Sequence, residues 1–330
     1  MEEVARFILN DPRLTTELKD LRHYFSPKDP SLKSVYLDAR DAAMDIGPAV
    51  MINSEEPARS ISQALTANAR RTEESLRVLE ELAKTEGTGL DGAKLQSARF
   101  AVYTLEKTLL GRLMRQDKIA LICGLHAVVD TASLGPRLPA EIACEMLRGG
   151  ARVIQLRDKF TPKRKLVEIA LEIAGLCYEY HALFIINDFL DIALAVDADG
   201  LHLGQDGLPI RVARKFMPLN RLIGCSVRSV VEAKQAHDEG ADYLGYGAVF
   251  ATNTKAEIHD LGCTILAQIK HEVGTPLVAT GGITPYNVTK ALHAGADGIV
   301  VASAITDATS TEAATRAFIK AMEVYHESSQ

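Results

Sequence analysis

The stretch Val153-Ile154-Gln155-Leu156-Arg157-Asp158-Lys159 decides the fold, because it begins apolar and ends polar. Successive side chains of a strand alternate faces, so Gln155, Arg157 and Lys159 share one face. Apolar residues on both faces at its start are typical of a parallel strand covered by helices. Cations at its end are costly unless an anion meets them. The run therefore predicts either an anion site or a plain exit into a solvated loop, and the other strand ends decide between them.

Composition limits the classes of function. The chain has 330 residues, of which 47% are hydrophobic and 24% charged, as in a soluble globular protein long enough for two domains. The formal net charge is −6 and the pI is near 5.9, which argues against a general binder of nucleic acid or acidic membranes. An anionic ligand must therefore be held by a local cluster of cations.

The cysteines and the first residues predict a cytoplasmic protein. The five cysteines are widely spaced and form no C-x-x-C motif, which predicts a reducing compartment without disulfides or structural zinc. Met1 is followed by Glu2 and Glu3 instead of the basic region of a signal peptide. No apolar run approaches the length of a transmembrane helix.

Residues 1–117 are predicted to form an all-helical domain ahead of a second domain at 118–330. Apolar residues spaced in threes and fours predict helices over 60–84 and 93–113. Glu2–Arg6 resembles Glu80–Lys84, which indicates a degenerate internal repeat. The first copy begins where its long helix should already be ending. Two hypotheses account for this: the chain start lies too late, or another subunit of a homo-oligomer covers the gap.

Charged residues in this helical part have two interpretations. They could line a site, or they could be solvated side chains paired along exposed helix faces. The residues concerned are Arg40, Asp41, Asp45, Asn68, Arg70, Arg71, Glu73 and Glu74.

From Ile119 onward short β-rich runs alternate with helical segments. Strands are predicted at 125–130, 152–158, 183–188, 200–204, 222–227, 243–249, 276–282 and 298–303. Eight strand–helix units in roughly 210 residues match a (β/α)8 TIM barrel. The rival, an open doubly wound sheet, would need a glycine-rich first turn, and Asp130-Thr131-Ala132-Ser133 is not one. The predicted fold is α/β, a TIM barrel preceded by an all-α helical domain.

Polar residues recur where the predicted strands end, which is where such barrels carry catalytic groups. They are Gln155, Arg157 and Lys159; Asn187 and Asp188; His202, Gln205 and Asp206; Ser226; Thr252, Thr254 and Lys255; Gly281 and Gly282; and Ala302 and Ser303. Together they predict cations, a hard metal ligand and two backbone-donor sites around one mouth.

Two phosphate sites follow from these residues. The Gly281-Gly282 loop, with Ala302-Ser303 leading into the last helices, matches the phosphate site that barrels build after strands seven and eight. The three cations Arg157, Lys159 and Lys255 exceed what a monoester needs. With Mg²⁺ on Asp188 they suit a pyrophosphate, whose departure requires charge neutralisation.

These segments resemble the thiamine phosphate synthase family over residues 119–303. They are QLRDK (155–159), IIND (185–188), DGLHLGQD (199–206), GCSV (224–227), TNTK (252–255), TGGI (280–283) and ASAI (302–305). The resemblance implies a transferase that joins hydroxymethylpyrimidine diphosphate to a thiazole phosphate, releasing pyrophosphate. The implied chemistry is dissociative: pyrophosphate leaves, the pyrimidine carries the cation, and the thiazole nitrogen attacks.

The resemblance also assigns roles to residues of this chain. Gln155, Arg157, Lys159, Asn187 and Lys255 would hold the pyrimidine diphosphate, and Asp188 would bind Mg²⁺. Ser226, with Arg157 and Lys159, would support the leaving group. Thr252, Thr254, Gly282, Ala302 and Ser303 would seat the thiazole phosphate. No general base is required, and His202 is interpreted as a packed strand residue.

One position departs from the family pattern. The family has a second Mg²⁺ carboxylate directly before Leu208, where this chain has Gly207. Three outcomes are open: a shifted loop lets Asp206 substitute, water completes the coordination, or activity is reduced.

The helical segment resembles an extension linked to phosphorylation of hydroxymethylpyrimidine phosphate. It contains no G-x-x-x-x-G-K-[ST] loop, so a packing or dimerisation module is the alternative. For the barrel, the alternatives are a thiazole tautomerase, which would not need the diphosphate cations, and a non-catalytic thiamine-phosphate sensor.

Overall fold

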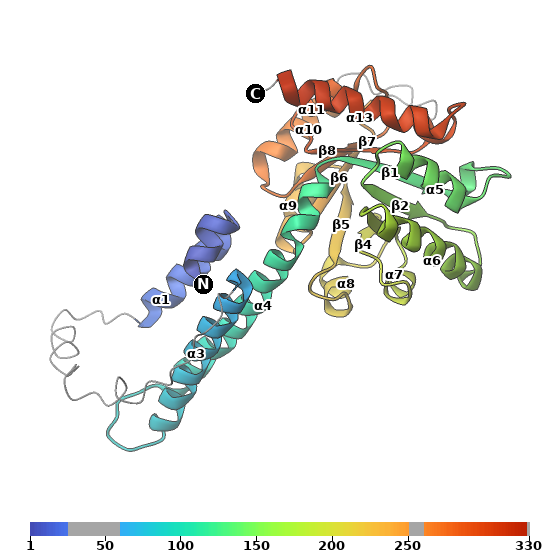
Figure 1. The fold of residues 1–330 in the computed structure, drawn as a ribbon. Coiled ribbons are helices and arrows are strands. Elements are labelled where there is room, and N and C mark those ends of the chain that lie inside the picture. The colour runs from blue at the N-terminus through green and yellow to red at the C-terminus, as the bar shows by residue number, and fades with distance from the viewer. Residues whose placement is uncertain (26–59, 251–260, 329–330) are drawn as a thin grey trace. The chain divides into compact units, whose positions relative to one another are not determined.

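The computed structural model describes residues 1–25, 60–250 and 261–328. The chain divides into two compact units, Met1–Met114 and Arg115–Gln330, and each is described by itself. Figure 1 shows the helices of the first unit and the strands and helices of the second.

The first unit is helical, as predicted. Its described elements are η1 (Val4–Ile8), α1 (Pro12–Phe25), α3 (Ile61–Leu82) and the start of α4 (Gly92–Ile122). Ser60 begins α3 with a capping box, in which its hydroxyl accepts from the Gln63 amide (3.2 Å) and its own amide donates to the Gln63 side chain (2.8 Å). Leucines at helical spacing, among them Leu65 and Leu109, pack together as the core of the unit.

Helix α4 is longer than the sequence predicted. Its expected end near Leu113 is wrong, because the helix continues to Ile122. Neither glycine nor proline interrupts the chain between Gly111 and Gly124. The apolar residues Ile119 and Ile122, which read as the onset of β structure, belong to this last part of the helix. Ile122 is fully buried against Val153 and Tyr243 in the interior of the barrel.

A carboxyl pair between α3 and α4 makes stability depend on pH. Burial, and then the neighbouring Glu106 carboxyl, raise the pKa of Glu73. A raised carboxyl pKa stabilises the fold below the pKa of the unfolded chain, and this contribution is lost as the pH rises. We therefore expect Glu73→Gln to raise the melting temperature at pH 7 by about 2 °C and to leave it unchanged near pH 3.5, below the ordinary glutamate pKa. Calorimetry at both pH values checks this.

The control is Glu74→Gln, the exposed neighbour on α3. An equal gain in the control, or a Glu73→Gln gain that persists at low pH, would contradict the explanation.

The second unit is a closed barrel of eight parallel strands in sequential order, which confirms the predicted TIM barrel. The strands are β1 (Leu125–Asp130), β2 (Val153–Arg157), β3 (Leu183–Asn187), β4 (Gly200–Leu203), β5 (Leu222–Val227), β6 (Tyr243–Gly247), β7 (Leu277–Thr280) and β8 (Gly298–Val301). Each lies within its predicted range.

Helices follow every strand, and Figure 1 shows them around the outside of the barrel. They are η3 (Thr131–Ser133) and α5 (Pro139–Arg148) after β1, then α6 (Lys163–Glu179), α7 (Leu190–Ala195), α8 (Ile210–Phe216), α9 (Val230–Asp238), α10 (Leu261–Glu272), α11 (Val288–His293), α12 (Ser303–Thr306) and α13 (Thr311–Ser328).

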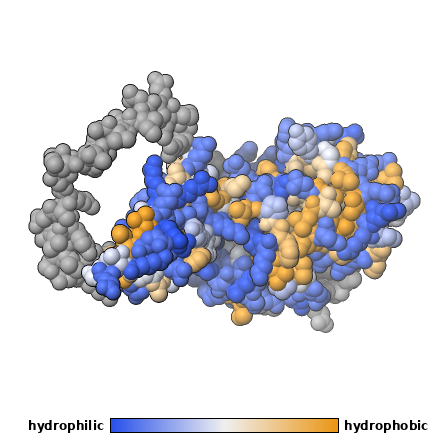
Figure 2. Space-filling view, turned by 90° about the horizontal axis from the view of Figure 1, so that it is seen from below, coloured by the Kyte–Doolittle hydropathy of each residue, from blue (hydrophilic) through white to orange (hydrophobic). Residues whose placement is uncertain are grey.

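Two apolar cores build the barrel. The outward faces of the strands pack with the helices in one large cluster that includes Ile154, Leu156 and Phe184. A smaller cluster fills the interior, where Val153 and Tyr243 meet Ile122. On the face drawn in Figure 2, hydrophobic side chains of this unit lie in patches among hydrophilic ones. Over the described ranges, no helix has both the length and the apolar character needed to cross a membrane.

Candidate active site

Strand register brings the predicted polar residues to one level at the mouth of the barrel. Arg157 on β2 pairs with Asp130 on β1 and with Asn187 on β3. Asn187 pairs in turn with His202 on β4. Because the barrel is closed and parallel, these strand ends face one opening. The structure therefore brings together side chains that the sequence spaces 15–30 residues apart.

Gln155 and Asn187 form one contact of the mouth. The Asn187 side-chain amide donates to the Gln155 side-chain oxygen at 3.1 Å. Gln155 is 4% exposed, so the amide that alternation places on the same face as Arg157 is buried. This contact joins two neutral polar groups, Asn187 at the end of β3 and Gln155 two residues before the end of β2.

Arg157 stands at the end of β2 in an ion pair with Asp130, the last residue of β1. The Arg157 side chain is 41% exposed, so its guanidinium can still reach a ligand. Sequence reasoning missed Asp130. Its signal was available, because the last residue of a predicted barrel strand lies at the catalytic face.

Lys159 lies beyond the end of β2, in an exposed loop. The loop is held by the buried Asp158, whose carboxylate accepts from the Thr131 hydroxyl (2.6 Å) and from the amides of Phe160 (2.9 Å) and Thr161 (2.8 Å). No ion pair of Lys159 occurs within the described ranges. The sequence grouped Lys159 with the strand, whereas the structure gives it a loop position that can approach a ligand.

Asp188 follows β3 directly and lies against the loop after β4. A Cβ atom at Gly204 would lie 3.2 Å from Asp188 Oδ2, and one at Gly207 would lie 3.6 Å from the same oxygen. Within the described residues the Asp188 carboxylate forms no ion pair. Residue 207 therefore faces Asp188, and a side chain there would point toward its carboxylate. No group of three or more histidine, cysteine or acidic ligands occurs in the described part of the chain.

Ser226, on β5, is held by a residue of β4 and by one of the loop that follows β4. His202 Nε2 lies 2.9 Å from Ser226 Oγ, and the Gln205 side-chain amide donates to the Ser226 carbonyl at 3.1 Å. The interpretation of His202 as a packed strand residue holds for its burial but omits this contact with a predicted catalytic hydroxyl. Burial lowers the pKa of His202 to about 4, so the imidazole is neutral at pH 7.

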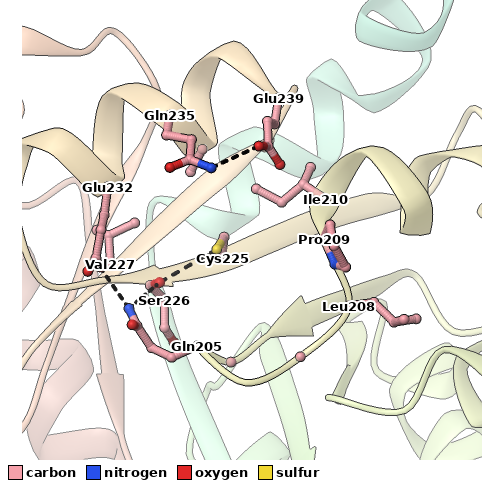
Figure 3. Close-up of a pocket in the computed structure, with 13 residues that line it drawn as sticks. Gln205, Leu208, Pro209, Ile210, Cys225, Ser226, Val227, Glu232, Gln235 and Glu239 are labelled. Atoms are coloured by element: carbon pink, nitrogen blue, oxygen red, sulfur yellow. Dashed lines mark hydrogen bonds between the residues drawn. The ribbon is translucent and has the colours of Figure 1, made fainter.

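A cavity of about 340 Å³ lies beside Ser226, between the loop after β4 and helix α9. Figure 3 shows Gln205, Cys225 and Ser226 at its wall, with Glu232 of α9 and Glu239, the residue that caps this helix. The amide of Gln205 also donates to Glu232 (2.8 Å), which ties the β4 loop to α9.

The loops after β7 and β8 lie next to each other, because these strands pair from Val278 with Gly298 to Thr280 with Val300. Gly281 and Gly282 have φ values of +88° and +66°, which favour glycine. The Asn287 side chain holds this turn, donating to the Gly282 carbonyl (2.9 Å) and accepting from the Thr284 amide (2.7 Å). The predicted residues Gly282, Ala302 and Ser303 thus belong to adjacent strand ends.

The remaining predicted residues lie either outside the described part of the chain or on its surface. Thr252, Thr254 and Lys255 lie outside the described residues, as do Arg40, Asp41 and Asp45 of the helical part. Asp206 is described and exposed. In the helical unit, Asn68 donates to the Ala64 carbonyl of its own helix, as a solvated face residue does.

Comparisons with known proteins give relatives for both parts of the chain. Residues 125–305 match the model of the thiamine monophosphate synthase family, and residues 1–108 match that of the ThiD2 family. The chain is 37% identical to thiamine-phosphate synthase of Nostoc sp. over 93% of this chain and 85% of that protein. It is 47% identical to thiamine-phosphate synthase of Methanospirillum hungatei over 61% of this chain and 98% of that protein.

A solved structure extends the likeness to the fold. Thiamine phosphate pyrophosphorylase from Pyrococcus furiosus superposes with a TM-score of 0.58 at 40% identity, covering 63% of this chain and 98% of that one. The family model spans the barrel from β1 to α12, and the relatives with the longer matches share the helical part as well. With the strand ends arranged as described, this chain belongs to the thiamine monophosphate synthase family of transferases.

Proposed function

We propose that the barrel joins 4-amino-2-methyl-5-hydroxymethylpyrimidine diphosphate to thiazole phosphate, giving thiamine phosphate and pyrophosphate. The observation that carries this proposal is the convergence of Arg157, Asn187 and Asp188 at adjacent strand ends, with Ser226 on β5 of the same barrel. A pocket for a monophosphate alone would not need this combination of a cation, an amide and a carboxylate.

The diphosphate half of the site is formed by β2 and β3. Arg157 would bind the diphosphate through charge-assisted hydrogen bonds, and Lys159 would approach it from its loop. Gln155 and Asn187 would contact the substrate from the barrel side of the mouth. Lys255, which lies outside the described residues, is proposed as the third cation because of its place in the TNTK segment.

Asp188 is a suitable ligand for Mg²⁺, because a carboxylate oxygen at the mouth matches the donor that this ion prefers. Mg²⁺ retains several waters in most protein sites, so a single carboxylate with a substrate diphosphate is a sufficient donor set. When bound, the ion would neutralise charge on the diphosphate. The protein's own residues would hold the leaving diphosphate in one orientation and exclude other conformations of the substrate.

The thiazole phosphate half is formed by β7 and β8. Gly282, Ala302 and Ser303 would offer backbone amides to the monophosphate, as this barrel face does in phosphate-binding members of the fold. Thr252 and Thr254 are proposed to complete the seat. The two phosphate groups would thus be held by different strand ends, which keeps the two substrates separate until they react.

The chemistry proposed is a dissociative substitution. The carbon–oxygen bond to the diphosphate breaks with both electrons on the leaving oxygen, and the electron-rich pyrimidine carries the cation. The lone pair of the thiazole nitrogen then forms the new carbon–nitrogen bond. Ser226 would donate a hydrogen bond to the leaving group, where charge accumulates. No general base is needed, in accord with the neutral His202.

Gly207 gives a prediction about the metal. Gly207→Asp would place a second carboxylate beside Asp188, because the Cβ would lie 3.6 Å from Asp188 Oδ2 and only the Gly204 carbonyl, at 3.1 Å, must give way slightly. We expect the Mg²⁺ concentration for half-maximal activity to fall about tenfold. A titration of activity against Mg²⁺ measures it. Gly207→Asn, with equal size and no charge, is the control, and an unchanged titration in Gly207→Asp would contradict the prediction.

For the helical unit, we propose a link to phosphorylation of hydroxymethylpyrimidine phosphate, the step that supplies the barrel's first substrate. The match of residues 1–108 to the ThiD2 family supports it. Incubation of the full chain with ATP and the pyrimidine monophosphate tests it. Formation of the diphosphate supports the link, and its absence leaves the unit as a packing or dimerisation module.

The experiment that tests the barrel's function mixes the full chain with both substrates and Mg²⁺ and follows pyrophosphate. A synthase releases pyrophosphate, whereas a thiazole tautomerase or a thiamine-phosphate sensor does not. The presence of Arg157, Lys159, Asn187, Asp188 and Lys255 together favours the synthase. The five cysteines, all free, support our proposal of a reducing, cytoplasmic location.

A further inference from the structure

A chain of three polar side chains runs through the barrel interior below the mouth. The Tyr243 hydroxyl lies 3.1 Å from His202 Nδ1, and His202 Nε2 lies 2.9 Å from Ser226 Oγ. We call Tyr243, His202 and Ser226 the polar column. Tyr243 is fully buried and His202 is 6% exposed, so these two members are shielded from solvent, whereas Ser226, near the end of β5, is half-buried.

Two glycines make room for the column. Gly224 is the register partner of Tyr243, and a Cβ there would lie 2.1 Å from the Tyr243 ring. A Cβ at Gly245 would lie 3.1 Å from His202 Cε1. Any side chain at position 224 would therefore displace the tyrosine. The glycines thus leave space for the rings of Tyr243 and His202. An interior filled by apolar side chains would not require glycine at these two positions.

The column carries no net charge. Burial lowers the pKa of His202 to about 4, and burial raises the pKa of Tyr243 above its usual range. At neutral pH the imidazole has a single N–H, and the phenol keeps its proton. The direction of both hydrogen bonds then depends on which nitrogen of His202 is protonated.

In the first tautomer, with the proton on Nδ1, His202 donates to the Tyr243 oxygen. The phenol proton then needs another acceptor. Besides His202, the ring of His126 stands edge-on to Tyr243 with centroids 5.6 Å apart. His126 donates from Nε2 to the Ile122 carbonyl (2.7 Å), while its Nδ1 is buried without a hydrogen-bond partner in the described structure. The phenol proton would remain unsatisfied, which is costly in a buried site.

In the second tautomer, with the proton on Nε2, both buried members of the column are satisfied. Tyr243 donates to Nδ1, and Nε2–H donates to the Ser226 oxygen. Ser226 then keeps its own proton for a third partner in the mouth. In the first tautomer, by contrast, Ser226 would donate its hydrogen bond to Nε2. It could then act toward a ligand only as a hydrogen-bond acceptor.

We propose that Tyr243 is a positioning residue: by donating to His202 it selects the Nε2–H tautomer and so directs the Ser226 hydroxyl proton toward the departing diphosphate oxygen. This inference rests on the proposed function for its last step. No proton is transferred, since Ser226 donates a hydrogen bond and keeps its proton throughout. The histidine acts through Ser226 and does not touch the substrate.

The first test observes the tautomer directly, without substrates. In ¹⁵N NMR of the full chain with labelled histidine, His202 is expected to show a protonated Nε2 and a bare Nδ1. Tyr243→Phe, which keeps the ring beside Gly224 and removes the hydroxyl, is expected to shift His202 toward a mixture of tautomers. The His202 signals are assigned by their loss in His202→Gln or, if that variant does not fold, by their displacement in Ser226→Ala. A protonated Nδ1 in the unaltered chain would overturn the proposal.

The second test is kinetic. Tyr243→Phe is expected to lower kcat for pyrophosphate release about tenfold with little change in KM for either substrate. In a Ser226→Ala background the same change should have no further effect, because Tyr243 acts only through the hydrogen bond that the Ser226 hydroxyl donates to the diphosphate. Tyr246→Phe is the matched control: a buried tyrosine on the same strand that packs in the outer core.

The outcomes separate the two proposals. If the unaltered chain releases no pyrophosphate, the proposed function fails, while the NMR result still decides the tautomer. If the unaltered chain is active and Tyr243→Phe matches it in kcat, or lowers activity equally with and without Ser226, the positioning role is refuted.

Discussion

Asp188→Asn is expected to lower the rate of pyrophosphate release by at least about 100-fold at saturating Mg²⁺. The substitution keeps the size of the side chain and removes the negative charge that we propose holds the metal. A steady-state assay with both substrates over a range of Mg²⁺ concentrations measures the effect. Asp188 has no ion-pair partner in the described structure, so its loss should cost the fold little.

Asp191→Asn is the control for this prediction. Asp191 lies three residues further on, at the start of α7, and pairs with Lys163 on the surface of the barrel. This variant should keep the activity of the unaltered chain. If Asp188→Asn behaves like the control at every Mg²⁺ concentration, the metal is held elsewhere. A similar loss in Asp206→Asn would show that Asp206 replaces the carboxylate missing at Gly207.

Arg157→Ala is expected to lower kcat/KM for the pyrimidine diphosphate about 1,000-fold, with the larger part in kcat. The guanidinium would neutralise charge that develops on the leaving diphosphate, so its contribution grows toward the transition state. The variant also leaves Asp130 without its partner, which places a bare carboxylate next to an anionic substrate.

Arg152→Ala is the matched control, because Arg152 precedes the same strand at its opposite end, where it donates to the Tyr180 carbonyl (2.8 Å). Equal activity in Arg157→Ala and Arg152→Ala would remove Arg157 from the site. Asp130→Asn separates the two effects of the ion pair. It should weaken activity less than Arg157→Ala, since it leaves the cation in place.

The barrel and its mouth could be predicted because their signals are local. Alternation along β2 placed Gln155 and Arg157 on one face, and the structure finds Gln155 buried inside the barrel with Arg157 at its rim. The strand ends Asn187 and Ser226 likewise follow short apolar runs. Once the barrel closes, such ends must meet at one edge, so a prediction about single strands became a prediction about a site.

The partners of these residues could not be predicted, because they depend on packing across the barrel. Tyr243 begins β6 and reads as an ordinary aromatic strand residue, yet it reaches His202 two strands away. The traces in the sequence are the glycines at 224 and 245, whose meaning depends on the register between β5 and β6 and on packing across the barrel. Asp130 could not be predicted for the same reason, because its role depends on an ion pair with Arg157 on the neighbouring strand.

Helix α4 illustrates a second limit. The last apolar residues of the helix pack into the interior of the barrel. In the sequence, the periodic helix pattern is therefore replaced here by the continuous apolar run of a buried segment. Such a run cannot be told from a strand by periodicity alone. Tertiary packing decides the outcome.

The most direct test of the central claim quantifies both products in one timed reaction of the full chain with the pyrimidine diphosphate, thiazole phosphate and Mg²⁺. We predict that thiamine phosphate and pyrophosphate form in equal amounts, and that removing Mg²⁺ with a chelator suppresses both together. Formation of neither product, or of thiamine phosphate without an equivalent of pyrophosphate, would contradict the claim that this mouth expels a diphosphate.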